Sequence, residues 1–304
     1  MVDNDCEAIW EQYSDRLSDV STRSEFSDLV WTMQGELGTS HAYEMGGDYE
    51  TPPQYRPGFL GADFRWDPDV EHEDVETSGG YEIRRIVRGQ GWESGSSSPL
   101  VQPGVRIEDG DILVSINGRA LEETDSIQEA LVNEAGKDVD LTVIHTEDDS
   151  FETYTVEALK SEFRARYRDW VRRNREIVHR ETDGQIGYVH IPDMGATGYS
   201  EFHRSYVSEK EKDGFIIDVR FNGGGNVSQL ILEKLARKRL GYTVRRWGVS
   251  TPYPADSIEG PLVALTNAYA GSDGDIFSHC FKLMDLGPLL GTRTWGGVVG
   301  IWPR

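Results

Sequence analysis

One serine stands where the sequence predicts a sharp turn from a strand into a helix. Ser272 follows the apolar run 261–266, typical of a buried strand, and precedes an apolar stripe at helical spacing over 276–284. The small residues around it let the backbone bend and let another molecule come close. The first amides of such a helix lack intrahelical partners and lie at its positive end. This setting suits a nucleophile for acyl transfer, and the simpler alternative is a helix cap formed by Ser272 or Asp273.

A second turn of bare backbone follows another predicted strand. Three glycines, 223–225, separate the apolar run 214–221 from a predicted helix over 227–240. In a parallel sheet both turns would lie at the carboxyl ends of strands, where ligands bind. The amides of Gly225 and Asp273 could then donate to one oxyanion. The triple glycine lacks the Gly-Lys-Ser/Thr ending of a phosphate-binding loop.

A serine nucleophile needs a base, and the residues leave two kinds open. His179, His190 and His279 lie on predicted helices or strands. His41 follows Ser40 on a glycine-bounded loop, where side chains can serve function, with an ordinary surface histidine as the alternative. A lysine base is the other option, but the segment 291–300 contains no lysine. No metal or cofactor is expected.

Composition narrows the class of protein. The 304 residues carry 53 acidic and 31 basic side chains, a net charge of −22, so nucleic acid is not an expected partner. Only 7 of the basic residues are lysine. An acidic composition poor in lysine resembles that of proteins from salt-loving organisms, and an ordinary solvated acidic face is the alternative. Cys6 and Cys280 are expected to be buried free thiols in a reducing cytoplasm. No apolar run approaches the ~18 residues of a membrane span, and the acidic N-terminus is unlike a signal peptide.

The order of predicted elements indicates a multidomain protein of mixed α+β and α/β class. Residues 1–55 form a helical N-terminal region, with two helices between 5 and 37 and no capping box on the second. Residues 56–158 form a β-rich module, and residues 159–304 form a layered α/β domain. Further elements are predicted from periodicity: strands at 79–87, 110–116, 186–191, 261–267 and 289–294, a pair of strands between 139 and 156, and helices at 126–133, 160–181 and 200–212. The arginines of 160–181 are expected to pair with acidic surfaces of their own chain.

The β-rich module resembles a PDZ domain in its bacterial and archaeal strand order. The resemblance is carried by the run Asp109-Gly110-Asp111-Ile112-Leu113-Val114-Ser115-Ile116-Asn117-Gly118, in which Asn117-Gly118 is a strong hairpin signal. Such a domain implies binding of an extended peptide as an added strand, and a structural spacer is the alternative.

The whole chain resembles the tricorn protease family of archaea and some bacteria. The motifs that carry the resemblance are Gly38-Thr39-Ser40-His41, Val-Arg-Phe-Asn-Gly-Gly-Gly (219–225), Asn-Ala-Tyr-Ala-Gly-Ser-Asp-Gly-Asp-Ile-Phe (267–277) and Gly-Thr-Arg-Thr-Trp-Gly-Gly-Val-Val-Gly-Ile (291–301). The related carboxyl-terminal processing proteases fit less well, because Gly297 stands where their catalytic lysine would be. The resemblance implies an α/β domain of the crotonase and ClpP type, and a cytoplasmic, hexameric peptidase that shortens peptides released by the proteasome.

The same resemblance implies a role for each site residue. Ser272 is the nucleophile, His41 the general base, and Ser40 the residue that orients it. Gly225 and Asp273 supply the amides of the oxyanion hole.

Three departures from the family leave other functions open. No equivalent of the family's supporting glutamate is found before Arg304, Thr243 stands where the family has an aspartate that selects basic side chains, and the preceding β-propellers are missing. The sequence therefore looks like a fragment cut at both ends. A non-catalytic, PDZ-bearing peptide-binding or assembly module and a small-molecule esterase are the alternatives.

Overall fold

The computed structural model describes residues 4–38, 40–50, 52–73, 77, 79–89 and 95–300. The chain divides into two compact units. Unit 1 joins residues 1–51 to residues 175–304, and unit 2 consists of residues 52–174. Thr39, part of the loop predicted to carry His41, lies outside the described residues.

Unit 2 is built on one antiparallel sheet. Its strands are β1 (Ala62–Asp67), β2 (Gly80–Ile86), β3 (Ile112–Ile116), β4 (Arg119–Ala120), β5 (Asp138–Ile144) and β6 (Phe151–Glu157). The order is β1-β2-β3-β5-β6, and β4 pairs with β3. Two short helices accompany the sheet: the 3-10 helix η2 (Pro99–Val101) and α3 (Ile127–Ala130), which is shorter than the helix predicted over 126–133.

The hairpin predicted from Asn117-Gly118 is confirmed. Both residues have positive φ, 52° and 73°, as a two-residue type I′ turn requires, and Ile116 pairs with Arg119 across it. Alternate residues of the strands face one apolar core, because side chains along a strand point to opposite faces in turn. The core includes Leu113, Ile116, Leu141, Val143 and Val156, each at most 2% exposed.

Unit 1 begins with the two helices expected between residues 5 and 37. They are α1 (Cys6–Ser14), extended by the 3-10 helix η1 (Asp15–Asp19), and α2 (Arg23–Gly35). The prediction that the second helix lacks a capping box is wrong. The Thr22 hydroxyl accepts from the Glu25 amide, and the Glu25 carboxylate accepts from the Thr22 amide. The pKa of Glu25 is lowered by hydrogen bonds to its carboxylate, first from the Ser21 amide and then from the Thr22 amide.

The arginine-rich helix α4 (Phe163–Glu181) pairs with acids of its own chain, as predicted. Asp169, only 1% exposed, accepts ion pairs from Arg172 and Arg173 one turn along the helix. Arg166 reaches Asp63 on β1 at 2.7 Å. A buried carboxylate is stabilised only when it is paired in this way, so these arginines serve the fold.

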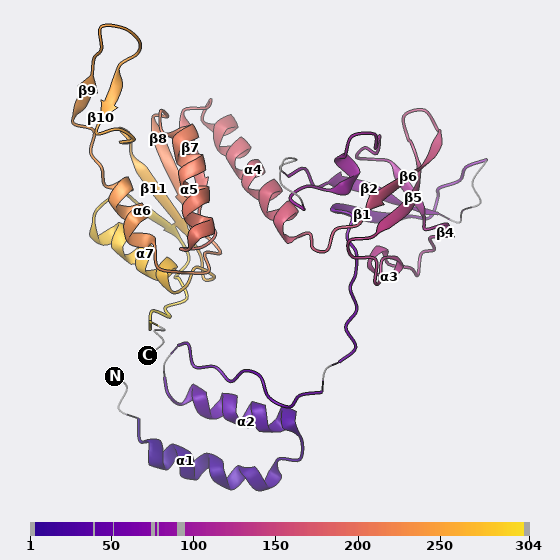
Figure 1. Ribbon diagram of the computed structural model, residues 1–304, viewed down its shortest axis with the longest axis horizontal. Coiled ribbons are helices and arrows are strands. Elements are labelled where there is room, and N and C mark those ends of the chain that lie inside the picture. The colour runs from indigo at the N-terminus through magenta and orange to yellow at the C-terminus, as the bar shows by residue number, and fades with distance from the viewer. Residues whose placement is uncertain are drawn as a thin grey trace. The chain divides into compact units, whose positions relative to one another are not determined.

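The remainder of unit 1 is a parallel sheet with helices between its strands. Its elements are β7 (Ile186–His190), α5 (Ala196–Glu209), β8 (Gly214–Asp218), α6 (Ser228–Leu235), β11 (Leu262–Thr266), α7 (Asp273–Leu283) and β12 (Leu289–Gly291). The strand order is β12-β11-β8-β7, all parallel. Since β8 and β11 are neighbours, the turns that follow them lie at one edge of the sheet (Figure 1).

The core on this sheet is formed in part by apolar residues that recur at helical spacing along α7. Phe277 and Phe281, one turn apart on α7, are fully buried and their rings lie 5.9 Å apart. They pack with Ile217 of β8 and Ala264 of β11 in one apolar cluster. The burial of α7 against β11 fixes the helix whose first turn adjoins Ser272.

Two expectations fail in unit 1. Cys6 is exposed and Cys280 is only partly buried, so the two thiols are not both core residues. The hairpin of β9 (Gly241–Thr243) and β10 (Thr251–Tyr253) was not predicted, because its strands are three residues long and too short to show a period. Within the described residues, no helix has the length and apolar composition needed to cross a membrane.

Candidate active site

Ser272 occupies a strained position between β11 and α7. Its φ of 55° and ψ of −120° lie in a region that side chains with a Cβ rarely adopt, at a typical cost of about 1–3 kcal/mol. Its side chain makes no capping hydrogen bond to α7, so the simple cap is wrong for this residue. The side chain is half-buried. A serine held in strain at a strand-to-helix turn is the geometry of a nucleophile elbow.

The two glycine-containing turns lie together, as their places in the sheet predict. The Gly271 amide donates to the Asn222 carbonyl at 3.0 Å, which joins the turn after β11 to the turn after β8. Gly224 has a φ of 82°, and a Cβ added there would come within 2.6 Å of the Ser272 Cβ. The glycine therefore allows the second turn to approach the serine closely.

The Asp273 side chain caps the neighbouring helix rather than its own. Its carboxylate accepts from the amide of Ser228, the first residue of α6, at 2.9 Å and from the Ser228 hydroxyl at 2.6 Å. Asp273 therefore caps α6, and not α7, the helix for which a cap was predicted from sequence. Because Asp273 begins α7, its own amide has no carbonyl one turn earlier in the helix to bond.

Backbone hydrogen bonds to Met194 hold the residues on both sides of Gly225. The neighbouring Asn226 amide donates to Met194 and the Gly224 carbonyl accepts from Met194, both at 2.7 Å. This ladder turns the Gly225 amide away from Met194. Among the described residues, neither the Gly225 nor the Asp273 amide has a hydrogen-bond acceptor.

Asn222 fixes the triple-glycine turn, a role that was missed from sequence. Its side-chain Oδ1 accepts from the Gly224 amide at 2.9 Å, and its Nδ2 donates to the Ile191 carbonyl at 2.8 Å. The residue is fully buried, so these bonds satisfy an amide that would otherwise be costly. An asparagine directly before three glycines was the available signal, since Asn side chains commonly bond the backbone two residues on.

His41 lies on a loop with its ring held on three sides. Its φ is 64°, and no helix or strand occurs among the described residues from 40 to 50. Its Nδ1 lies 2.9 Å from the Ser40 hydroxyl oxygen. The ring also makes edge contacts with Tyr43 and Trp295, at centroid distances of 6.2 and 5.4 Å.

One cavity of about 360 Å³ brings the candidate nucleophile and base together. Its lining comes from the loop of His41, the turn after β8 and the turn after β11: His41, Tyr43, Asn222, Gly223, Ala268, Tyr269, Gly271, Ser272 and Trp295. The lining contains no Asp, Glu, Lys or Arg. An uncharged part of a ligand can therefore enter the cavity without removing water from a charged side chain.

The three histidines set aside from sequence lie elsewhere. His190 is buried and donates from Nε2 to the Arg220 carbonyl at 2.8 Å, and burial lowers its pKa. His179 pairs with Glu209 at 2.8 Å. His279 is exposed on α7. None of them lines the cavity of Ser272, whereas His41 does.

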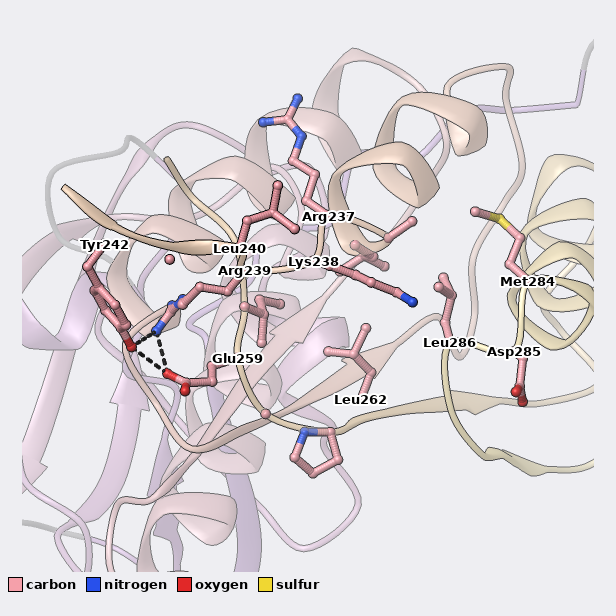
Figure 2. Close-up of a pocket in the computed structure, with 16 residues that line it drawn as sticks. Arg237, Lys238, Arg239, Leu240, Tyr242, Glu259, Leu262, Met284, Asp285 and Leu286 are labelled. Atoms are coloured by element: carbon pink, nitrogen blue, oxygen red, sulfur yellow. Dashed lines mark hydrogen bonds and ion pairs between the residues drawn. The ribbon is translucent and has the colours of Figure 1, made fainter. Parts of the chain in front are cut away.

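A larger cavity of about 680 Å³ lies near the opposite end of β11, around Leu262 (Figure 2). Arg239 is tied there to Glu259 at 2.7 Å, to the Tyr242 hydroxyl at 3.2 Å and to the Ser257 carbonyl at 2.6 Å. Its lining contains no serine, cysteine or histidine. Thr243, exposed at the end of β9, lines neither cavity.

Family profiles match most of the chain. Peptidase family S41 matches residues 185–304, the tricorn protease PDZ domain matches residues 58–161, and the tricorn protease C1 domain matches residues 1–35. The expected fold class, with a helical region, a PDZ domain and an α/β peptidase domain, is thereby confirmed.

Individual proteins align over nearly the whole chain. The tricorn protease of Thermoplasma volcanium is 46% identical over 98% of this chain and 28% of its own length. A putative tricorn-like protease C-terminal subunit of Sulfurisphaera tokodaii is 45% identical over 98% of this chain and 33% of its own length. The crystal structure of the tricorn protease superposes with a TM-score of 0.88 at 41% identity, covering 98% of this chain and 28% of that one. The chain thus spans about a third or less of the length of these relatives.

Proposed function

The chain belongs to the tricorn protease family, and on that premise we propose that it is a serine peptidase that hydrolyses oligopeptides through Ser272. The observation that supports this most is the strained Ser272 in one cavity with His41. A backbone outlier at a half-buried serine points to function more than to folding, because strain persists only where the surroundings impose it.

The first step is attack by the Ser272 hydroxyl oxygen on the carbonyl carbon of the scissile peptide. His41 Nε2 takes the hydroxyl proton as the new C–O bond forms. The bond between Ser40 and His41 Nδ1 supports this, because it leaves Nε2 as the nitrogen for proton transfer. For Nε2 to accept the proton, Nδ1 must carry the hydrogen and donate it to the Ser40 oxygen.

The negative charge that develops on the carbonyl oxygen needs donors already in place. The amides of Gly225 and Asp273 fill this role, since neither is engaged by an acceptor among the described residues. Such donors are typically worth about 3 kcal/mol each in the transition state. The Asp273 carboxylate keeps its amide in place by binding Ser228.

Collapse of the tetrahedral intermediate breaks the peptide C–N bond. The imidazolium of His41 returns its proton to the leaving nitrogen, so the amine product leaves neutral. Water then attacks the acyl group on Ser272 in the same way, with His41 as base, and releases the carboxylic acid product. The two halves balance in protons and regenerate the free serine.

A fluorophosphonate probe tests this assignment directly. We expect covalent labelling at Ser272, detected by peptide mass spectrometry, which disappears in Ser272→Ala and is strongly slowed in His41→Ala. Ser200→Ala, an exposed serine on α5, is the matched control and should label normally. Labelling that is indifferent to His41 would remove that base. Peptide binding with no labelling would favour the non-catalytic alternative instead.

Thr243 is the proposed position of specificity. By family resemblance, the residue after Gly241-Tyr242 serves a neighbouring copy in a cytoplasmic hexamer, where an aspartate would select basic side chains. A threonine has no charge to pair with Lys or Arg, so we expect little preference for cleavage after them.

Thr243→Asp should raise kcat/KM for substrates with Lys or Arg before the cleaved bond by about tenfold or more relative to apolar ones. Thr243→Asn is the matched control, since it has a similar shape without the charge. A rise for both variants, or for neither, in protein shown by light scattering to be assembled, would contradict this role.

A further inference from the structure

Trp295 touches both the loop that carries His41 and the turn that carries Ser272. Its ring meets the His41 ring edge-on, with centroids 5.4 Å apart and an interplanar angle of 73°. Its indole also covers Gly271, where an added Cβ would come within 2.9 Å of the indole Cε3. Gly271 directly precedes Ser272, so one side chain bridges the two parts of the proposed site.

The backbone beside Trp295 is anchored on both sides of Ser272. The Trp295 amide donates to the Ala270 carbonyl, in the turn before the serine, at 2.9 Å. The Gly296 amide donates to Asp275 Oδ1, in the first turn of α7, at 2.8 Å. We call residues 295–296 the Trp295 strap. Its two bonds fix the strap to the same elements that hold the serine.

Asp275 is placed for this one anchoring bond. It is 6% exposed, and its second oxygen, Oδ2, is buried without a hydrogen-bond partner among the described residues. A buried carboxylate with an unpartnered oxygen is unfavourable for stability. The bond to the strap is thus made by a group that the fold alone would not favour, which is typical of a functional position.

The His41 loop supplies little restraint on its own ring. Two of the described ring contacts, to Ser40 and Tyr43, come from the same loop and move with it. Trp295 comes from a segment more than 250 residues later, anchored to the sheet domain. A base that is misplaced by about 1 Å can lose about 100-fold in rate, so a contact that fixes the ring relative to Ser272 has a large effect.

We propose that Trp295 is a positioning residue that holds the His41 imidazole toward Ser272, and that Asp275 fixes the strap that carries it. This rests on the proposed function, because the orientation of His41 matters to the rate only if His41 is the base. The edge of the indole restricts rotation and displacement of the imidazole. The two backbone bonds hold the indole in place relative to Ser272, so the imidazole is also held in place relative to the serine.

The kinetic test compares Trp295→Ala with Trp295→Phe. We expect Trp295→Ala to lower kcat by about 10- to 100-fold with KM little changed. Trp295→Phe should recover most of the rate, because a smaller aromatic ring keeps an edge against His41. Phe163→Ala, an aromatic residue 77% exposed on α4, is the control and should leave both constants unchanged. A rise in KM alone would mean that Trp295 binds substrate instead.

A second readout does not depend on hydrolysis. The ring C–H resonances of His41, assigned by their loss in His41→Ala, should move in Trp295→Ala because the indole ring current is removed. Movement of these resonances in a protein that hydrolyses nothing would support the contact while the proposed function fails. Unchanged resonances together with a slower reaction would overturn the positioning role.

Asp275 gives an independent arm of the same test. Asp275→Asn keeps an Oδ1 acceptor for Gly296 and should retain most of the activity, whereas Asp275→Ala should move the His41 resonances and slow hydrolysis like Trp295→Ala. The double variant with Trp295→Ala should be no slower than either single one, because both act through one strap. Additive losses would show that the two residues act separately.

Discussion

Peptide hydrolysis is expected to disappear when Ser272 is replaced by alanine, with kcat falling by about 10⁶-fold. Ser272 is the only aliphatic hydroxyl in the lining of the cavity, which contains no cysteine or second serine, and its other hydroxyls are the phenols of Tyr43 and Tyr269. Only the oxyanion amides and substrate binding would then accelerate hydrolysis, which leaves a small residual rate over water. The measurement is turnover of a fluorogenic oligopeptide, with the loss appearing in kcat rather than in KM.

The backbone at Ser272 supplies a control that separates lost chemistry from lost folding. Ser272→Ala keeps the strained φ of 55°, whereas Ser272→Gly can adopt that conformation freely. Both variants should be inactive, but the glycine variant should be at least as stable as wild type in thermal unfolding, because relief of about 1–3 kcal/mol of strain outweighs the entropy of glycine. Activity in either variant, or its loss in Ser200→Ala, would show that the nucleophile lies elsewhere.

Local periodicity was sufficient to predict most of the sheet domain. β8 and β11 are continuous apolar runs because both faces of a parallel sheet are covered, and the glycine turns after them mark where the strands end. The boundaries were less accurate. Helix α5 begins at Ala196 rather than at Ser200, because Gly195 adopts the extended conformation of an N-cap without any side chain to signal it.

The contacts that assemble the candidate site could not be predicted in this way. Trp295 bonds Ala270 across 25 positions, and its contact with His41 crosses 254, and no local period encodes either. Asp275 shows the same limit, since its spacing from Ser272 fits an ordinary first-turn acid that favours the helix dipole. Side chains that act through tertiary contacts carry no local signal, so they emerge only from the folded structure.

Replacing His41 by alanine is expected to reduce kcat nearly as much as replacing Ser272, by about 10⁵- to 10⁶-fold. Without the imidazole the serine hydroxyl remains protonated near neutral pH and is a weak nucleophile. The double variant Ser272→Ala with His41→Ala should be no slower than either single variant, since the two groups act in one proton transfer. Single-turnover acylation by a fluorophosphonate in the His41 variant measures the loss of the base directly.

Chemical rescue distinguishes a lost base from a collapsed loop. Truncation of His41 enlarges a cavity already of about 360 Å³, so added imidazole should reach Ser272 and restore part of the rate, with a pH dependence that follows the added base. Imidazole should rescue neither Ser272→Ala nor the double variant, because neither retains a nucleophile. If added bases restore no hydrolysis in the His41 variant while its fold and probe binding are intact, His41 orients the substrate rather than taking the proton. If the His41 variant hydrolyses peptides at the wild-type rate, the base is another group, and the bond between Ser40 and His41 serves only the loop.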